Sequence, residues 1–508
     1  MTKNLEQETI NSKSNELAQK LNEITNFVTT AAEKGVSVDV VERKLWSQVL
    51  AIGHQSMGMY FDLCGDGDMG ATITLPDGRV LNRLPGLHPK PYQSVFGPLV
   101  KPRVVYGTRE GQKIEKVPLD ERLLFPESKF SYLLQDWDQS LAVKDAYAKV
   151  DETISRILNF SQSVDSLERM NNNMAQDVGA FWDALPVPPA DEEGEIMVCS
   201  ADGKGVVIRG DRPKTKHNRI DPEADNKPEG KKMSLVGAVY SIDRHERTPE
   251  AIVEALFRDN PKASGEGSPP RPKPQHKHVR ASLIRDAADT MQPSIEEIFG
   301  WMTQECQLRN PLKEKDTILL MDGQPSLWIA GKQYSGDENI TEILDLIHAA
   351  AYVWDAAHIF HPKNSKDAET FTRERLLKLL NGQVDSVVRG LRWIGTHQNL
   401  NKKKAEKLKT VCRYFNNNAH RMRYDEYLEK GYPIASGVIE GACRYVVKDR
   451  MERTGMRWVL NGAHSMLQLR SVHASGLWDE FTPFRIAKER ERLYPDADKS
   501  EKPERLVA

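Results

Sequence analysis

Residues 196–208 read IMVCSADGKGVVI, and the predicted fold depends on this stretch. The apolar runs 196–199 and 206–208 each predict a buried strand, because a short apolar run bounded by turn residues is typical of one. Asp202 is expected to close the first strand, and the glycines that follow it allow close approach of a ligand to the backbone. Residues 235–242 (LVGAVYSI) predict the next strand.

Further strands and helices are predicted after this stretch. Residues 317–321 (TILLM) predict a short buried strand that ends at Asp322. Residues 343–347 (ILDLI) predict another, unless the following helix extends back into them. Apolar spacing predicts helices over 249–258 and 279–302. Strands that alternate with helices predict an α/β core.

A long helical region is predicted to interrupt this core. Apolar side chains recur at a helical spacing between residues 376 and 394, and a last helix is expected to begin near Ser436. Residues 363–430 contain 16 Lys or Arg against 8 Asp or Glu, although the whole chain has a formal net charge of −2. The net charge by itself does not predict a nucleic-acid partner, but the charge is segregated, with cationic segments in the second half of the chain.

The amino-terminal part differs from the rest in composition. Residues 1–35 are a polar leading segment with weak helical spacing, and a helix is expected to follow up to about residue 60. Residues 70–118 contain β-favouring runs separated by Pro and Gly, which predict a small sheet or ribbon. Residues 186–195 (PVPPADEEGE) are typical of a linker that contributes nothing to a core.

Residues 150–185 predict two helices separated by a short polar break at residues 161 and 162, which is the length pattern of a helix-turn-helix. Apolar side chains of the second helix fall on one stripe. Arg169 and Asn173 therefore lie on other faces, where they can contact base edges or phosphates. An ordinary helical hairpin packed on a neighbour explains the same pattern.

Length and composition restrict the class of protein. A chain of 508 residues favours three to five structural units. Its five cysteines form no CxxC or CxxH pair, which argues against a disulfide scaffold and a zinc ribbon. The apolar runs are too short to span a bilayer, and the first residues do not have the pattern of a secretory signal. We therefore expect a cytoplasmic protein without a membrane partner.

Three acidic residues occur where a metal site would need them. Asp202 and Asp322 are expected at strand ends, and Glu440 is expected in the first turns of the helix near Ser436. Adjacent strand ends and a neighbouring helix can bring three carboxylates together. Carboxylate oxygens suit Mg²⁺ or Mn²⁺, and two such ions can promote in-line attack on a phosphodiester.

A plainer interpretation of these acidic residues stays open. Aspartate followed by glycine commonly marks a turn, which would explain Asp202 and Asp322 without any metal. Glu440 and Arg444 stand at i and i+4, so they can form an ordinary salt bridge on a helix surface.

Five ordered blocks of sequence carry a family resemblance. They are ADGKGV (201–206), KKMSLVGAVYSIDRHERTPE (231–250), LLMDGQPSLW (319–328), ILDLIHAAAYVWDAA (343–357) and GYPIASGVIEGACRYVVKDRMERTGMRW (431–458). Together they resemble a bacterial insertion-sequence DDE transposase of the ISKra type, a member of the RNase H-like superfamily. The match is strong over residues 196–480 and weaker before them.

The resemblance implies an α/β RNase H-like catalytic core formed by residues 191–348 and 431–508, the latter range including a carboxy-terminal tail. An all-α insertion, residues 349–430, would interrupt this core. A helical and β-ribbon DNA-binding region would precede it, formed by residues 36–118 and a helix-turn-helix-like segment, 119–190.

The resemblance also implies the catalytic residues and their cofactor. Asp202, Asp322 and Glu440 take the places of the ligands of two Mg²⁺ or Mn²⁺ ions. Asp345 and His348 match the D-x-x-H signature of related transposases. Neutral imidazole matches Mg²⁺ poorly, so we expect His348 to have a structural or DNA-positioning role. Trp354 can stack on an unpaired base, or it can pack in the core.

The implied activity is binding of the terminal inverted repeats of an insertion sequence, followed by metal-dependent strand cleavage and strand transfer. The implied partner is double-stranded DNA, both transposon ends and target, bound by a homodimer or a higher oligomer. Phosphate contacts are expected from basic side chains of the insertion and of the helix that carries Glu440, namely Lys402, Lys403, Lys404, Arg444, Lys448 and Arg450.

Two other functions are compatible with the same residues. One is an RNase H-like nuclease that cleaves DNA without joining it. The other is a sequence-specific DNA-binding protein or repressor whose catalytic core is inactive.

Overall fold

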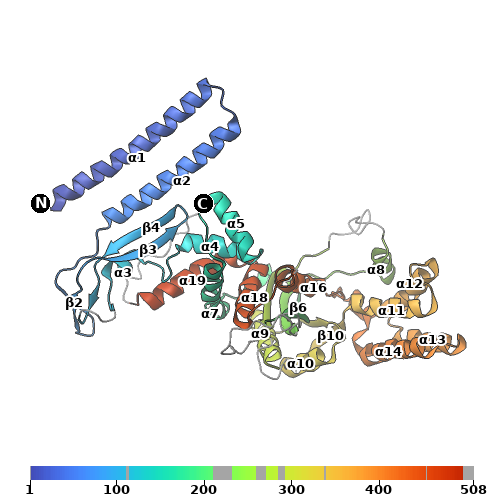
Figure 1. Cartoon of the computed structure of the whole chain (residues 1–508). Helices are drawn as coiled ribbons and strands as arrows, with labels where there is room; N and C mark the ends of the chain where they lie inside the picture. Colours follow the sequence, from blue (N-terminus) through green and yellow to red (C-terminus); the bar gives the residue numbers. More distant parts are fainter. Residues whose placement is uncertain are drawn as a thin grey trace, which may run out of the picture. The chain divides into compact units, whose positions relative to one another are not determined.

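The computed structural model describes residues 2–109, 114–209, 231–258, 271–283, 292–336, 339–453 and 455–495. The chain forms two compact units (Figure 1). The first comprises the chain up to Asp177 together with the segment that begins at Trp478, and the second is Val178–Leu477.

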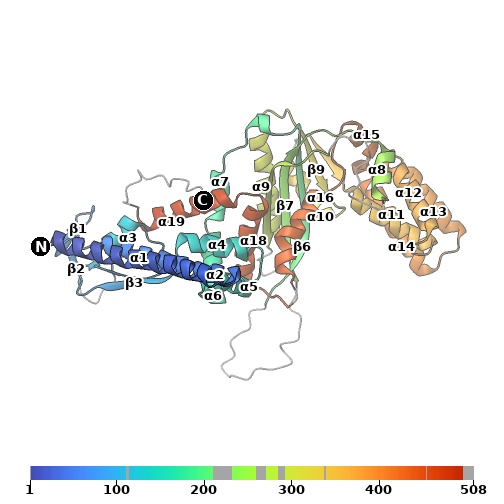
Figure 2. The same cartoon turned by 90° about the horizontal axis from the view of Figure 1, so that it is seen from above.

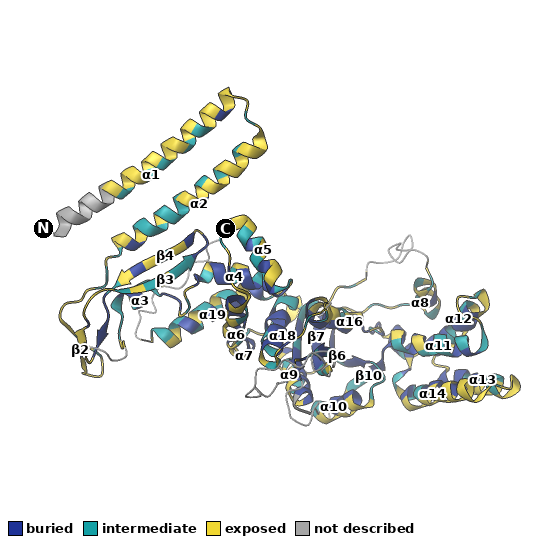
Figure 3. Ribbon diagram, in the orientation of Figure 1, coloured by how far each residue is buried: buried dark blue, intermediate teal, exposed yellow. Residues whose placement is uncertain are grey.

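The first unit begins with two long helices, α1 (Thr2–Glu33) and α2 (Val38–Leu63), which form a hairpin. Both were predicted from their apolar spacing. Most of their described surface is exposed (Figure 3). The exposed side chains include apolar ones, such as Leu21 and Val38, which are 56% and 81% exposed.

The predicted β region follows the two helices. Strands β1 (Thr72–Thr74), β2 (Val80–Arg83) and β5 (Tyr106–Gly107) form an antiparallel sheet. Strands β3 (His88–Ser94) and β4 (Gly97–Arg103) form a separate hairpin. Leu81, Val104 and Tyr106 are fully buried and form a small core of their own.

Short helices complete the first unit: α3 (Pro118–Leu123), α4 (Tyr132–Ala142), α5 (Tyr147–Leu158) and α6 (Val164–Ala175). The second helix of the predicted pair is divided, because the chain turns at residues 176–177 before α7 (Val178–Ala184), which belongs to the second unit. Asn171 of α6 is buried and donates to Gln139 Oε1 of α4 at 3.1 Å. Arg169 and Asn173 are exposed, and Arg169 pairs with Asp165 at 3.0 Å.

The carboxy-terminal helix α19 (Trp478–Leu493) also belongs to the first unit, which differs from the predicted grouping of residues 431–508 with the catalytic core. The indole of Trp478 donates to Asp136 Oδ1 of α4 at 2.8 Å. Arg485 is buried and donates to Gln135 Oε1 at 2.7 Å. These buried polar contacts attach α19 to α4. The tail beyond residue 495 lies outside the described residues.

The second unit is built on a mixed five-stranded sheet of β6 (Ile196–Val207), β7 (Lys231–Ile242), β8 (Gln275–Leu283), β9 (Asp316–Met321) and β10 (Ile340–Leu344). The strand order is β10-β9-β6-β7-β8. β7 is antiparallel to both β6 and β8, whereas β9 is parallel to both β6 and β10. The sheet lies in the buried centre of this unit (Figure 3).

Two predictions about this sheet were wrong. Residues 196–208 do not form two strands joined by a turn, because β6 pairs continuously with β7 from Ile196 to Val207 and Asp202 stands opposite Val236. The predicted helix over 279–302 begins later, since residues 275–283 form β8 and helix α9 is Gln292–Arg309. In both places, pairing with β7 outweighs the local turn or helix signal, as tertiary context often does.

Helices surround the sheet and extend beyond it. α8 (Pro249–Leu256) was predicted, whereas α10 (Pro325–Ser335) was not. The region predicted to be helical contains α11 (Leu346–Phe360), α12 (Lys366–Leu380), α13 (Val384–His397), α14 (Lys402–Asn418) and α15 (Tyr424–Glu429). Figure 2 shows α11–α14 to one side of the sheet.

The chain then returns to the sheet through a helix that changes its winding. α16 (Gly437–Ala442) continues into a π-helical turn, η4 (Cys443–Lys448), and then into α17 (Asp449–Met451). α18 (Leu460–Ala474) packs against β8. None of the helices in the described ranges has the length and apolar composition that crossing a membrane requires.

The predicted linker contributes to a buried ion-pair cluster. Glu193 and Arg309 each have a side chain that is 1% exposed, and they pair at 2.5 Å. Lys315 pairs with the same glutamate at 2.6 Å. Two cations compensate the cost of burying this carboxylate, which is the condition under which a charge can be buried.

Candidate active site

The register of the sheet places Asp202 and Asp322 side by side. β6 and β9 are parallel, with Ile196 opposite Asp316 and Cys199 opposite Leu319. The same register, continued, brings Asp202 beside Asp322. The strands stay together beyond the last paired residues, because Ser200 Oγ donates to the carbonyl of Leu320 at 2.7 Å.

Asp345 continues this row of carboxylates on the next strand. β10 is parallel to β9, with Leu344 opposite Met321. The backbone N–H of Asp345 donates to the carbonyl of Met321 at 2.9 Å, so Asp345 follows directly beside Asp322. Three neighbouring strands therefore carry aspartates at one level of the sheet.

Glu440 approaches this row from helix α16. Asp345, His348 and Glu440 each offer a ligand atom, and these atoms lie within 4.8 Å of one another. One turn after Glu440, the thiol of Cys443 lies 4.0 Å from the carbonyl oxygen of Asp202. Asp322 and Glu440 thus act on His348, and Asp202 acts on Asp322, although these residues are far apart in the sequence. Among the described residues, the cluster of ligand atoms within 4.8 Å contains Glu440 but neither Asp202 nor Asp322.

The local surroundings of these carboxylates differ from the sequence expectation. Asp202 lies within β6 rather than at its end, and its side chain accepts from the N–H of Gly203 at 2.7 Å. Asp322 does follow its strand, and it forms a turn by accepting from the N–H of Gln324 at 2.9 Å. Glu440 is exposed, and Arg444 pairs with Asp449 at 3.4 Å.

Asp345 is fully buried and accepts four hydrogen bonds. Oδ1 accepts from the backbone N–H groups of Ile347 at 3.2 Å and Ser436 at 2.9 Å. Oδ2 accepts from the backbone N–H of His348 at 3.3 Å and from its Nδ1 at 2.5 Å. These donors occupy both carboxylate oxygens. Asp345 therefore caps α11 and anchors the start of α16.

The ionisable groups of the site shift one another's pKa. Burial raises the pKa of Asp322, and the nearby carboxylate of Asp202 raises it further. The hydrogen bond to Asp345 raises the pKa of His348, with Asp322 and Glu440 adding to this effect. Burial alone would raise the pKa of Asp345, but hydrogen bonds from His348 and Ser436 lower it below its ordinary value. Carboxylate oxygens are the ligands that hard divalent cations such as Mg²⁺ prefer, and a bound cation would favour the ionised form of Asp322.

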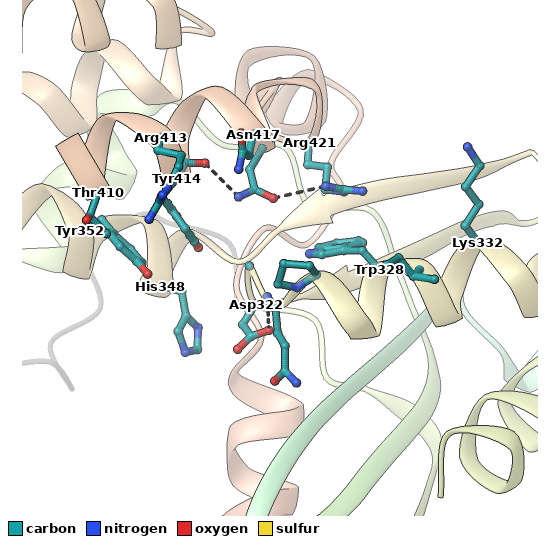
Figure 4. A pocket seen from close by; sticks show the side chains of 15 residues that line it. Asp322, Trp328, Lys332, His348, Tyr352, Thr410, Arg413, Tyr414, Asn417 and Arg421 are labelled. Atoms are coloured by element: carbon teal, nitrogen blue, oxygen red, sulfur yellow. Dashed lines mark hydrogen bonds between the residues drawn. The ribbon is translucent and has the colours of Figure 1, made fainter. Parts of the chain in front are cut away.

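A pocket of about 640 Å³ adjoins Asp322 and His348 (Figure 4). Tyr352 of α11 and Tyr414 of α14 form one wall, with their rings stacked at 3.7 Å. Tyr414 lies so close to Gly323 that a Cβ there would stand 2.2 Å from the tyrosine ring. A side chain at residue 323 would therefore displace the wall.

The opposite wall consists of Trp328 of α10 and Arg421, whose guanidinium lies 4.2 Å from the centre of the indole ring. Arg421 also donates to Glu342 Oε2 at 2.6 Å, which fixes its orientation. Arg413, Asn417 and Lys332 are exposed and also line the pocket. Sequence analysis predicted none of these pocket residues. The excess of positive charge over residues 363–430 was a signal for Arg413 and Arg421, whereas Trp328, Lys332 and Tyr352 lie outside that range.

The other predicted site residues occupy varied positions. Arg444 and Lys448 are exposed on the helix that carries Glu440, and Lys402, Lys403 and Lys404 are exposed at the start of α14. Arg450 differs from the expectation of a phosphate contact, because it is 1% exposed and lies 4.9 Å from the ring of Trp458. Trp354 is partly buried against the core and contacts Phe257.

The π-helical turn has a clear partner in α18. The buried side chain of Arg470 donates from Nε to the carbonyl of Val446 at 2.6 Å. A side chain that takes a backbone carbonyl out of the helical pattern is one of the known causes of such irregular turns. The turn directly follows α16, so its contact with α18 helps to hold in place the helix that carries Glu440.

Neither the known protein-family models nor the curated proteins include a match to this chain. The function therefore has to be argued from the residues of the site and from the sequence blocks quoted above.

Proposed function

We propose that this protein is a DDE transposase, which binds the terminal inverted repeats of an insertion sequence, cleaves at its ends and joins the 3′-hydroxyl to target DNA. The observation that carries the proposal is the sheet register that sets Asp202 beside Asp322, with Glu440 brought next to His348 by α16. These are the three residues that the sequence blocks assign as metal ligands.

The topology of the second unit supports an RNase H-like core. Three antiparallel strands, β6, β7 and β8, come first in the chain, and β9 and β10 are added on the other side of β6 as parallel strands. Helices α9 and α10 separate the later strands. The helical region α11–α15 stands between β10 and Glu440, where the proposed family has its insertion.

In this proposal the residues of the site have distinct roles. Asp202, Asp322 and Glu440 hold two Mg²⁺ or Mn²⁺ ions, which when bound supply charge neutralisation for phosphoryl transfer. Asp345 holds His348 and the start of α16 in place. His348, with its raised pKa, can donate a hydrogen bond to a phosphate oxygen.

Exposed basic side chains give the proposal its DNA contacts. Arg444 and Lys448 lie one and two turns after Glu440, so they reach phosphates that flank the reacting one. Lys402, Lys403 and Lys404 extend the positive surface along α14. Two ends have to be joined in concert, so we propose that a homodimer or a higher oligomer assembles on DNA.

The test is strand transfer with end DNA taken from the sequence that flanks the gene. Asp202→Asn, Asp322→Asn and Glu440→Gln should each reduce cleavage and joining by about a thousandfold or more, because positioned charge stabilisation supplies most of the rate. Binding of the ends, measured by fluorescence anisotropy, should persist. Asp385→Asn, at an exposed position on α13, is the matched control and should retain full activity.

Other outcomes would identify the alternative functions. Full cleavage by any of the three variants would remove that residue from the proposed site. Joining that fails even when pre-cleaved ends are supplied would indicate a nuclease. Binding of the ends that is insensitive to chelator, without cleavage in Mg²⁺ or Mn²⁺, would indicate a DNA-binding protein or repressor.

A further inference from the structure

We infer that the pocket beside Asp322 binds one unpaired nucleotide of the DNA strand whose phosphodiester lies at the carboxylates, an inference that rests on the proposed function. The pocket adjoins the carboxylates, because it is lined by Asp322 and by His348, whose pKa is raised by Asp345, Asp322 and Glu440. Figure 4 shows Asp322 and His348 among the lining side chains, so a strand held at the carboxylates would pass beside this pocket.

The size of the pocket selects an unpaired nucleotide. A volume of about 640 Å³ is in the range of pockets that enclose a small ligand. A base with its sugar fits such a volume, whereas a duplex is far too wide to enter it. Enzymes that bind a base in this way unstack it first, at a cost that is smallest where the strand is already unpaired.

The walls of the pocket suit the faces and edges of a base. Tyr352, Tyr414 and Trp328 supply aromatic surface, and Ile329, which is 67% exposed, supplies aliphatic surface. Aromatic surface of this kind binds bases with little sequence preference. Trp328 is 4% exposed, and its indole Nε1 has no hydrogen-bond partner among the described residues. Because that nitrogen is itself buried, the accessible aromatic surface comes mainly from the partly buried Tyr352 and Tyr414.

The rim of the pocket suits the phosphates on either side of that base. Arg413 and Lys332 are exposed there, on α14 and α10 respectively. Arg413 and Asn417 also line a second pocket, of about 620 Å³, between α13 and α14, where Arg392 and Lys409 add positive charge. The basic surface thus continues from the carboxylates along α14, which gives the strand a path beyond the unpaired nucleotide.

The experiment uses the full chain and a short duplex that carries a single-stranded 3′ overhang, with 2-aminopurine at the first unpaired position. The same duplex with a blunt end is the comparison, and Ca²⁺ replaces Mg²⁺ so that binding is measured without turnover. The fluorescence of 2-aminopurine should change on binding, because stacking against aromatic side chains alters its emission.

Two variants at exposed positions remove pocket contacts with little risk to folding. Arg413→Ala and Ile329→Glu should each weaken binding of the overhang by about fivefold or more and abolish the fluorescence change, while blunt-duplex binding changes by less than about twofold. Arg389→Ala on α13 and Leu308→Glu on α9 are the matched controls, since both positions are exposed and neither lines the two pockets.

Equal weakening of overhang and blunt duplex, or no weakening of either, would overturn the inference. The experiments distinguish failure of the pocket inference from failure of the proposed transposase function. Pocket variants that bind overhang normally while the wild type cleaves and joins DNA would refute the pocket alone. Overhang binding that depends on the pocket, in a protein without metal-dependent cleavage, would refute the transposase activity alone.

Discussion

The carboxylate of Asp345 joins two helices by accepting hydrogen bonds from the first turn of α11 and from the residue that precedes α16. Its Oδ1 receives the N–H groups of Ile347 and Ser436, one from α11 and one at the start of α16. A buried carboxylate with every oxygen occupied stays ionised and cannot move without loss of several charge-assisted bonds. The position of Glu440, four residues after Ser436, therefore depends on Asp345.

Asp138 in the first unit is a buried carboxylate whose pKa is raised, whereas the pKa of Asp345 is lowered. It is fully buried in α4 and accepts from Gln162 Nε2 at 2.8 Å, while its Oδ2 has no partner among the described residues. Burial raises the pKa of Asp138 to about 7. The folded protein therefore binds a proton that the unfolded chain has already released between about pH 4 and 7.

We expect Asp138→Asn to raise the stability of the first unit at pH 8 and to do so less at lower pH. For a carboxyl with a raised folded-state pKa, wild-type stability falls by up to about 1.4 kcal/mol per pH unit between about pH 4 and 7, and is constant above that range. Thermal unfolding of both proteins at pH 5 and pH 8 measures the difference. Asp165→Asn, at an exposed ion pair, is the control, and an equal shift at both pH values would contradict this account.

At the scale of elements, β7 determines the shape of the second unit. It pairs along its length with β6 and with β8, which outweighs the turn signal at 202–203 and the helical spacing after 279. Helix α9 packs against the same strand at Gly237, where a Cβ would stand 2.5 Å from Ile298 Cγ2. Only glycine allows this close approach of helix and strand.

Gly237→Ala should destabilise the second unit by about 1–3 kcal/mol, because the added methyl group overpacks a rigid interface. Gly300→Ala in α9 is the matched control, since its Cβ would meet nothing within 4 Å. That variant should be neutral or more stable by up to about 1 kcal/mol, from helix propensity. Denaturant unfolding of the two variants provides the comparison. Equal stability of both would show that α9 does not pack closely at residue 237.

At the scale of the whole molecule, the chain is organised as two units that each have their own buried residues. The first unit uses residues from both ends of the described chain, since α19 packs on α4. The second contains the five-stranded sheet, the carboxylates Asp202, Asp322, Asp345 and Glu440, and the pocket beside Asp322. The positive charge of residues 363–430 is thus placed in the same unit as Asp202, Asp322 and Glu440.

This division predicts that the two units respond separately to the changes described above. Amide hydrogen exchange, followed by mass spectrometry, should show Asp138→Asn altering protection in α4, α5 and α6 without a change in β7. Gly237→Ala should do the reverse, because distant sites with no shared partner behave independently. Protection that changes across both units for either variant would show that they unfold as one body.

The sequence by itself determined the local elements. It indicated the helices at the amino terminus, the small β region, most strands of the large sheet, the helical region with its basic charge, and the acidic residues that stand near strands and helix starts. Periodicity and turn residues act over a few positions, so they are readable without knowledge of the fold. The resemblance to DDE transposases is a matter of sequence blocks in the same way, and it stays a prediction until chemistry is measured.

Tertiary structure alone decided the relations between distant residues. The register that sets Asp202 beside Asp322 depends on strand pairing, which no local pattern specifies. The burial of Arg450, the four bonds to Asp345 and the pocket between α10, α11 and α14 depend on segments far apart in the chain. The local sequence around a charged residue is the same whether its side chain is exposed to water or packed against a neighbouring element. Only the packed fold therefore decides whether that side chain is available at the surface or is buried in the structure.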